Sequence, residues 1–119
     1  MKRQTLRLGT RASKLARWQA EWVAARLTET GYDVQLVEIA TAGDQQTDTP
    51  LADLGSTGVF TNAIQRALIA GEVDLAVHSL KDLPTATLPG LTLAAIPLRA
   101  APFDVLVSRE PTTLAGLPT

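Results

Sequence analysis

A dense group of polar side chains follows the short apolar run 75–77. It consists of His78, Ser79, Lys81 and Asp82. Polar groups at the end of a buried strand cost free energy unless they bond one another or a ligand. A lysine beside an aspartate in a cleft can hold an anion and move a proton. Plainer interpretations are a hydrogen-bonded core histidine, a solvated lysine and an aspartate that caps a turn.

A second candidate is the segment 9–13, Gly-Thr-Arg-Ala-Ser, which leaves an expected strand and enters an expected helix. Backbone N–H groups at a helix start attract anions, and the Arg11 guanidinium can bind a carboxylate or phosphate through two hydrogen bonds. In the alternative, Ser13 or Thr10 only caps the helix and Arg11 is solvated. The segment is no dinucleotide fingerprint, because its second and third glycines are missing.

A third candidate is the glycine-rich segment 55–61. Its glycines permit a loop that closes over a ligand, and Phe60 could pack on a flat ring. The alternative is a glycine-rich entry into a helix, with Phe60 in the core. His78 is the single histidine and has no spaced companions, so the sequence predicts no metal site.

The three candidate segments must be positioned by strands and helices, and the sequence predicts that these alternate along the chain. We expect strands at 5–8, 33–39 and 73–77, helices at 13–30 and from 57 or 61 to 70, and a loop at 41–54. Later strand candidates are 91–98 and 103–108. The apolar face expected for the first helix consists of Leu15, Trp18, Trp22 and Ala25.

This alternation predicts an α/β fold with parallel strands. Ligands of such sheets bind beyond the carboxyl ends of the strands. We therefore expect three segments to meet there, namely 9–13, 41–44 and 78–82.

Composition indicates one ordinary globular domain. The chain has 119 residues, of which 45% are hydrophobic and 19% charged, with a net charge of −1. This balance gives no general attraction to nucleic acid. Neither a signal peptide nor a membrane-spanning run is recognisable, so a cytoplasmic protein is expected. The absence of cysteine excludes disulfides, thiolate metal sites and cysteine nucleophiles.

Taken in order, four segments resemble hydroxymethylbilane synthase (porphobilinogen deaminase), an enzyme family of tetrapyrrole biosynthesis. They are 8–13, 41–44, 58–61 and 76–84, and the last, Ala-Val-His-Ser-Leu-Lys-Asp-Leu-Pro, is the most specific. Its spacing from the first segment also matches the family. The resemblance covers essentially the whole chain.

The resemblance implies an α/β lobe of the type II periplasmic-binding-protein kind, with helices flanking a mixed, mainly parallel sheet. Residues 1–100 would form the N-terminal substrate- and cofactor-binding domain, and residues 101–119 a hinge strand and linker. Family members have a second, arginine-rich domain and a third whose cysteine holds the dipyrromethane cofactor by a thioether. Both are missing here, so we expect this chain to be an N-terminal fragment that is inactive alone. A full-length member would be a cytoplasmic monomer.

The family joins four porphobilinogen molecules head to tail onto the dipyrromethane primer, with release of ammonia, on the way to haem and chlorophyll. By resemblance, Asp82 is the catalytic carboxylate. The implied cofactor contacts are Lys81, Ser79, Arg11 and Ser13, and the implied substrate contacts are Arg11, Ser13, Gln19 and Phe60. Each pyrrole carries an acetate and a propionate, which suits arginine and lysine, and loss of ammonia leaves a cation that a fixed carboxylate stabilises.

Some positions depart from the family pattern. Asp53 and Thr57 stand where lysines are usual. Segment 62–65 reads Asn-Ala-Ile-Gln where a Lys-Glu type sequence is common, and segment 101–104 reads Ala-Pro-Phe-Asp where Asp-Pro-Arg-Asp is usual. These changes affect primer binding and loop closure but leave Lys81 and Asp82 intact. Two alternatives to the enzyme therefore stay open: a small-molecule binding module of the same fold class, and a non-catalytic degenerate homologue.

Overall fold

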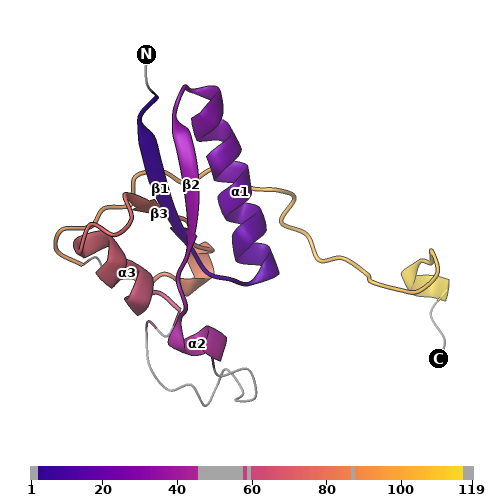
Figure 1. The fold of residues 1–119 in the computed structure, drawn as a ribbon. Coiled ribbons are helices and arrows are strands. Elements are labelled where there is room, and N and C mark those ends of the chain that lie inside the picture. Colours follow the sequence, from indigo (N-terminus) through magenta and orange to yellow (C-terminus); the bar gives the residue numbers. More distant parts are fainter. Residues whose placement is uncertain (1–2, 46–57, 59, 87, 117–119) are drawn as a thin grey trace.

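The computed structural model describes residues 3–45, 58, 60–86 and 88–116 (Figure 1). Its strands are β1 (Thr5–Thr10), β2 (Asp33–Glu38) and β3 (Leu75–Ala76). Its α-helices are α1 (Lys14–Glu29), α2 (Ala42–Gln45) and α3 (Asn62–Ile69). Two 3-10 turns follow, η2 (Leu80–Asp82) and η3 (Leu114–Gly116). The expected alternation of strand and helix is confirmed, except that residues 42–45 of the expected loop are helical.

The three strands form a parallel sheet in the order β2-β1-β3. β1 pairs with β2 from Thr5 opposite Asp33 to Thr10 opposite Glu38, and with β3 at Leu8 and Gly9. Because both pairings are parallel, all three strands present their carboxyl ends at one edge of the sheet. The α/β class with parallel strands is thereby confirmed.

A clamp between Arg7 and Asp74 fixes the start of β3 against β1. The Asp74 carboxylate accepts hydrogen bonds from the Arg7 backbone N–H at 2.8 Å, from Nε at 3.1 Å and from Nη2 at 2.7 Å. In return, the Asp74 N–H donates to the Arg7 carbonyl at 2.9 Å. The hydrogen bonds from Arg7 lower the pKa of Asp74 to about 2. The clamp joins two strands that lie far apart in the sequence.

Helix α1 begins at a serine cap and packs on the sheet through small side chains. The Ser13 Oγ accepts the Ala16 N–H at 3.3 Å, and Gly31, with φ of 100°, follows the last turn. Ala16 and Ala20 are buried. These side chains let the helix approach β1 and β2 closely, and α1 runs alongside these two strands in Figure 1.

The apolar face expected for α1 was wrong. Leu15 is 52% exposed and Trp18 62% exposed. The helix carries a second apolar stripe through Ala16 and Ala20, which also repeats at helical spacing. The stripe of small residues faces the sheet because it permits closer packing, and the larger side chains are left outside.

The core lies where α1 and α3 pack on the sheet. Its large, fully buried apolar side chains are Leu8 of β1, Ile64 of α3 and Val73 just before β3. Burying each of these contributes roughly 1.5–3 kcal/mol relative to exposure. Helix α3 contacts β1 and β3, and α1 contacts β1 and β2, so the two helices cover different strand pairs (Figure 1).

The strands expected at 91–98 and 103–108 were wrong. Neither range is a strand, and every residue from 92 to 116 is exposed. Leu98 is 97% exposed and Val107 89% exposed. In Figure 1 the last part of the chain runs away from the sheet toward the C-terminus, and the sheet of the described residues contains only β2, β1 and β3, so neither range pairs with a strand. Apolar, β-branched composition alone does not form a strand without such a partner.

Among the described residues, no helix is both long enough and apolar enough to cross a membrane.

Candidate functional site

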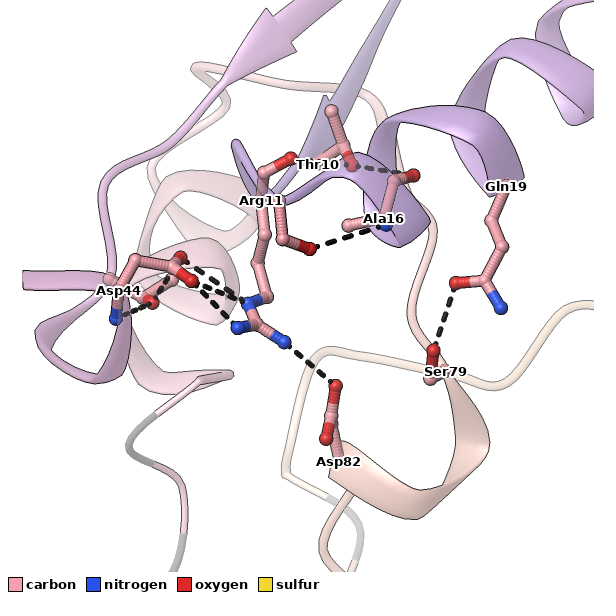
Figure 2. A network of polar contacts seen from close by, with 9 residues as sticks. Thr10, Arg11, Ala16, Gln19, Asp44, Ser79 and Asp82 are labelled. Atoms are coloured by element: carbon pink, nitrogen blue, oxygen red, sulfur yellow. Dashed lines mark hydrogen bonds and ion pairs between the residues drawn. The ribbon is translucent and has the colours of Figure 1, made fainter. Parts of the chain in front are cut away.

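Three segments meet at the edge formed by the carboxyl ends of the strands. Arg11 follows β1, Asp44 lies in α2 after β2, and Asp82 ends η2 after β3 (Figure 2). The meeting of segments 9–13, 41–44 and 78–82 expected from the sequence is confirmed. It follows from parallel pairing, because each crossover returns the chain to the same edge of the sheet.

Arg11 lies between two carboxylates and bonds both. Its Nη2 lies 2.6 Å and its Nε 3.1 Å from Oδ1 of Asp44, while its Nη1 lies 3.1 Å from Oδ2 of Asp82. The exposed side-chain fractions are 17% for Arg11, 19% for Asp44 and 13% for Asp82. Arg11 is therefore paired rather than solvated. The three groups together carry one net negative charge in a partly buried position.

The face of the Arg11 guanidinium lies on an aromatic ring. Its central carbon is 4.0 Å from the centroid of the half-buried Phe60 ring, a distance typical of cation–π contact. The sequence left two roles open for Phe60, packing on a flat ring or burial in the core. The structure places its ring against a flat group, which is the Arg11 guanidinium. Gly58, two residues before Phe60, has a φ of 94°, and a Cβ there would clash with Oδ1 of Asn62.

Thr41 anchors Asp44. The Thr41 hydroxyl donates to Oδ2 of Asp44 and accepts the Asp44 N–H at 3.2 Å, and Thr41 is fully buried. Burial raises the pKa of Asp44, but the hydrogen bonds from Arg11 and Thr41 outweigh it and hold that pKa below its ordinary value. Burial lowers the pKa of Arg11, and the hydrogen bonds and charges of the two aspartates more than reverse this. The hydrogen bonds and charge interactions therefore favour the charged forms of both groups, against the effect of burial.

A hydrogen bond also joins α1 to the 3-10 turn that carries Asp82. The Ser79 Oγ donates to Oε1 of Gln19 at 2.9 Å, as Figure 2 shows. Ser79 is the N-cap of η2, so this bond ties the start of the turn to the helix. Two residues expected to contact cofactor or substrate thus lie together, one turn away from Asp82.

Ser13 is the cap of α1, as one of the two interpretations expected. Its Oγ accepts the Ala16 N–H at 3.3 Å. Thr10 is fully buried and its hydroxyl lies 3.2 Å from the Ala16 carbonyl oxygen, so it secures the same turn. Both hydroxyls hold the turn that carries Arg11.

His78 is partly buried beside the charged groups. Burial lowers the pKa of His78; the charge of Asp82 raises it and that of Arg11 lowers it, so that it lies below 6.5. Its Nδ1 is enclosed and has no hydrogen-bond partner among the described residues. The interpretation of His78 as a hydrogen-bonded core histidine is therefore not supported at Nδ1. The neutral imidazole is the form that suits this partly buried position.

Lys81 is exposed on η2, and within the described part of the chain it forms no ion pair. Asp53, Gly55 and Thr57 lie outside the described residues. Over the ranges that the structure describes, no three histidine, aspartate or glutamate side chains gather as a metal site would require.

The arrangement offers a carboxylate acceptor, Asp82, next to one cation, Arg11. Oδ2 of Asp82 accepts from Arg11, and Oδ1 receives no hydrogen bond from any described residue. Sequence reasoning assigned no role to Asp44, although it placed segment 41–44 at the site. One signal for Asp44 was available in the sequence. Asp44 follows Thr41 by three residues, a spacing typical of a threonine that caps a helix and an acidic residue in the first helical turn.

Comparison with known proteins places the chain in a family. Residues 6–119 match the family model described as "Porphobilinogen deaminase, dipyromethane cofactor binding domain". The chain is 54% identical over 119 residues to porphobilinogen deaminase 1 of Streptomyces coelicolor, with 99% of this chain and 37% of that protein covered. It is 53% identical over 113 residues to porphobilinogen deaminase of Cutibacterium acnes, with 95% and 34% covered.

These relatives are longer than the chain, which spans little more than a third of their length. The match to the family model nevertheless runs from β1 through the last described residue, and it includes the whole Arg11–Asp44–Asp82 group. The chain therefore belongs to the porphobilinogen deaminase family, in which it corresponds to the dipyrromethane cofactor-binding domain.

Proposed function

We propose that this chain supplies the catalytic carboxylate and the cofactor-binding surface of a hydroxymethylbilane synthase. The reaction is the stepwise head-to-tail condensation of four porphobilinogen molecules onto a dipyrromethane primer, with release of ammonia. The observation that carries the proposal is Asp82, a partly buried carboxylate with one unbonded oxygen, held beside Arg11 where the parallel strands end.

Asp82 is suited to stabilise a positive charge on a pyrrole. Loss of ammonia from porphobilinogen leaves a cationic, electron-poor pyrrole. A charge pair 4 Å apart gains about 1 kcal/mol in water and about 4 kcal/mol at the effective dielectric of a protein surface. The Asp82 side chain is only 13% exposed, so its interaction with that cation is less screened than in water. Its free Oδ1 can also accept a pyrrole N–H or a proton.

The residues present fit dipyrromethane as a ligand, since it combines N–H donors with carboxylate side chains. Asp82 would accept the N–H groups, and Arg11, Lys81, Ser79 and Ser13 would bind the carboxylates. Two of the five N–H donors of Arg11 are not used by Asp44 or Asp82. Gln19 and Phe60 would contact substrate. When bound, the group supplies the pyrrole to which the first porphobilinogen is joined, and its covalent anchor lies outside this cysteine-free chain.

The wider organisation that we propose is the one implied by the family resemblance. Residues 1–100 would be one lobe of a type II periplasmic-binding-protein-like pair, and residues 101–119 the hinge strand and linker to a second domain. The exposed apolar side chains from Leu93 to Val107 support a neighbouring domain there. The full enzyme would be a cytoplasmic monomer of three domains, with porphobilinogen as its substrate and without nucleic-acid or membrane partners.

The test is a chimera in which residues 6–119 replace the corresponding part of the Streptomyces coelicolor relative. Ammonia release and hydroxymethylbilane formation from porphobilinogen are measured. We expect activity from the chimera, a loss of at least about 100-fold with Asp82→Asn, and none from the 119-residue chain alone. A folded but inactive chimera would support the degenerate homologue, and full activity of Asp82→Asn would remove Asp82 from the mechanism.

A further inference from the structure

We propose that Asp44 is a positioning residue that holds Arg11 in a pose where a single nitrogen reaches Asp82, so that Oδ1 of Asp82 stays open to the substrate. The value of that free oxygen rests on the function proposed for Asp82. The positioning itself depends only on the contacts among the three side chains.

Asp44 occupies one edge of the Arg11 guanidinium. Nε and Nη2 both point at the Asp44 carboxylate, with distances to Oδ1 of 3.1 and 2.6 Å. Two hydrogen bonds from one planar group fix its orientation as well as its position. Nη1 is then left to face Asp82, which it reaches at 3.1 Å.

Asp44 is itself held in place from behind. Thr41 is fully buried, donates its hydroxyl proton to Oδ2 of Asp44 and accepts the Asp44 N–H at 3.2 Å. The Phe60 ring supports the guanidinium face, with its centroid 4.0 Å from the central carbon. Asp44 and Phe60 together leave the guanidinium little freedom to rotate toward Asp82.

Without the Asp44 charge, Asp82 would be the remaining carboxylate partner of Arg11 among the described residues. A planar guanidinium that faces one carboxylate tends to bond both of its oxygens. Arg11 would then occupy the oxygen that the substrate requires. Asp44 thus competes with Asp82 for Arg11 and limits the interaction between Arg11 and Asp82 to one hydrogen bond.

His78 is a natural reporter of this geometry, because it is the single histidine of the chain. The charges that act on it are those of Asp82 and Arg11. Its imidazole C–H signals in NMR therefore give a pKa that changes when Arg11 moves relative to Asp82. This measurement requires neither catalysis nor a bound ligand.

The experiment is a double-mutant cycle on the 119-residue chain. The pKa of His78 is measured with and without Asp44→Asn, first with Arg11 present and then in the Arg11→Gln background. If Asp44 acts through Arg11, Asp44→Asn changes this pKa by about 0.4 or more with Arg11 present and leaves it unchanged without Arg11. Equal changes in both backgrounds indicate a direct charge effect and overturn the proposal, as does no change in either.

Asp74→Asn is the matched control, since it breaks the other Arg–Asp pair that uses both Nε and Nη2. It should leave the pKa of His78 unchanged. If Asp44→Asn does not fold, Thr41→Val removes the hydroxyl that aligns Asp44 and keeps every charge. It must then change the pKa of His78 when Arg11 is present and not in the Arg11→Gln background.

The chimera separates positioning from catalysis. There, Asp44→Asn should lower kcat by about 10- to 100-fold and change KM less. A chimera that stays fully active with Asp82→Asn would refute the proposed function, while the His78 cycle would still decide whether Asp44 positions Arg11.

Discussion

Nη1 of Arg11 lies 3.1 Å from Oδ2 of Asp82, although 71 positions separate the two residues in the sequence. The contact joins the loop after the central strand to the turn after an edge strand. Asp44, 33 positions from Arg11, completes the group from the opposite edge strand. The segments that follow the three strands are thus tied together by one guanidinium.

Removing that guanidinium should destabilise the fold. Arg11→Gln leaves Asp44 and Asp82 partly buried near each other without their shared cation, at an expected cost of about 2 kcal/mol. The free energy of unfolding in urea at neutral pH measures this. Arg17→Gln, which breaks the exposed pair with Glu38, should cost about 0.5 kcal/mol or less. Equal costs for the two variants would show that the ion pairs of Arg11 with Asp44 and Asp82 stabilise the fold no more than an exposed ion pair does.

The Arg7–Asp74 clamp should make stability depend on acid. The pKa of Asp74 is lowered in the folded chain from 3.8 to about 2, so its stabilising effect is fully present above 3.8 and is lost as the pH falls toward 2. The free energy of unfolding is measured from pH 6 downward in the wild type and in Asp74→Asn. The difference in free energy of unfolding between the wild type and Asp74→Asn should be constant above pH 3.8. It should shrink as the pH falls from 3.8 toward 2. A difference that persists at the acid end would contradict the assignment.

His78 should titrate below 6.5 in the folded chain, because burial disfavours its charged form. The folded state then binds this proton less tightly than the unfolded state. The contribution of His78 to stability is therefore fully present above its pKa in the unfolded chain. It is lost as the pH falls through the lower pKa of the folded chain. Imidazole NMR signals followed between pH 4 and 8 give the midpoint directly. A midpoint above 6.5 would mean that Asp82 outweighs burial.

Gly58 should resist substitution for two reasons. Its φ of 94° disfavours any side chain, and a Cβ would clash with Oδ1 of Asn62. We expect Gly58→Ala to cost about 1 kcal/mol or more in thermal unfolding. Gly71→Ala, where φ is 71° and the space is open, tests the backbone contribution alone. Adding Asn62→Ala to Gly58→Ala should recover the steric part, and no recovery would show that the cost is purely conformational.

Local patterns identified most elements of the fold. Ser13 and Gly31 mark the ends of α1, and the apolar runs mark β1 and β2, because caps and periodicity act over neighbouring residues. The meeting of segments 9–13, 41–44 and 78–82 was also predictable, since parallel strands joined by helices end at the same edge of the sheet. The motifs around Arg11 and Asp82 indicated the family, which comparison then confirmed.

Contacts between distant segments decided the rest. Both stripes of α1 repeat at helical spacing, and only packing on the sheet selected Ala16 and Ala20 over Leu15 and Trp18. The apolar segments 91–98 and 103–108 have strand composition, yet a strand exists only where another backbone lies alongside to accept and donate hydrogen bonds. The sharing of Arg11 between Asp44 and Asp82 likewise has no local signature, because ion pairing depends on distances in space that the sheet alone establishes.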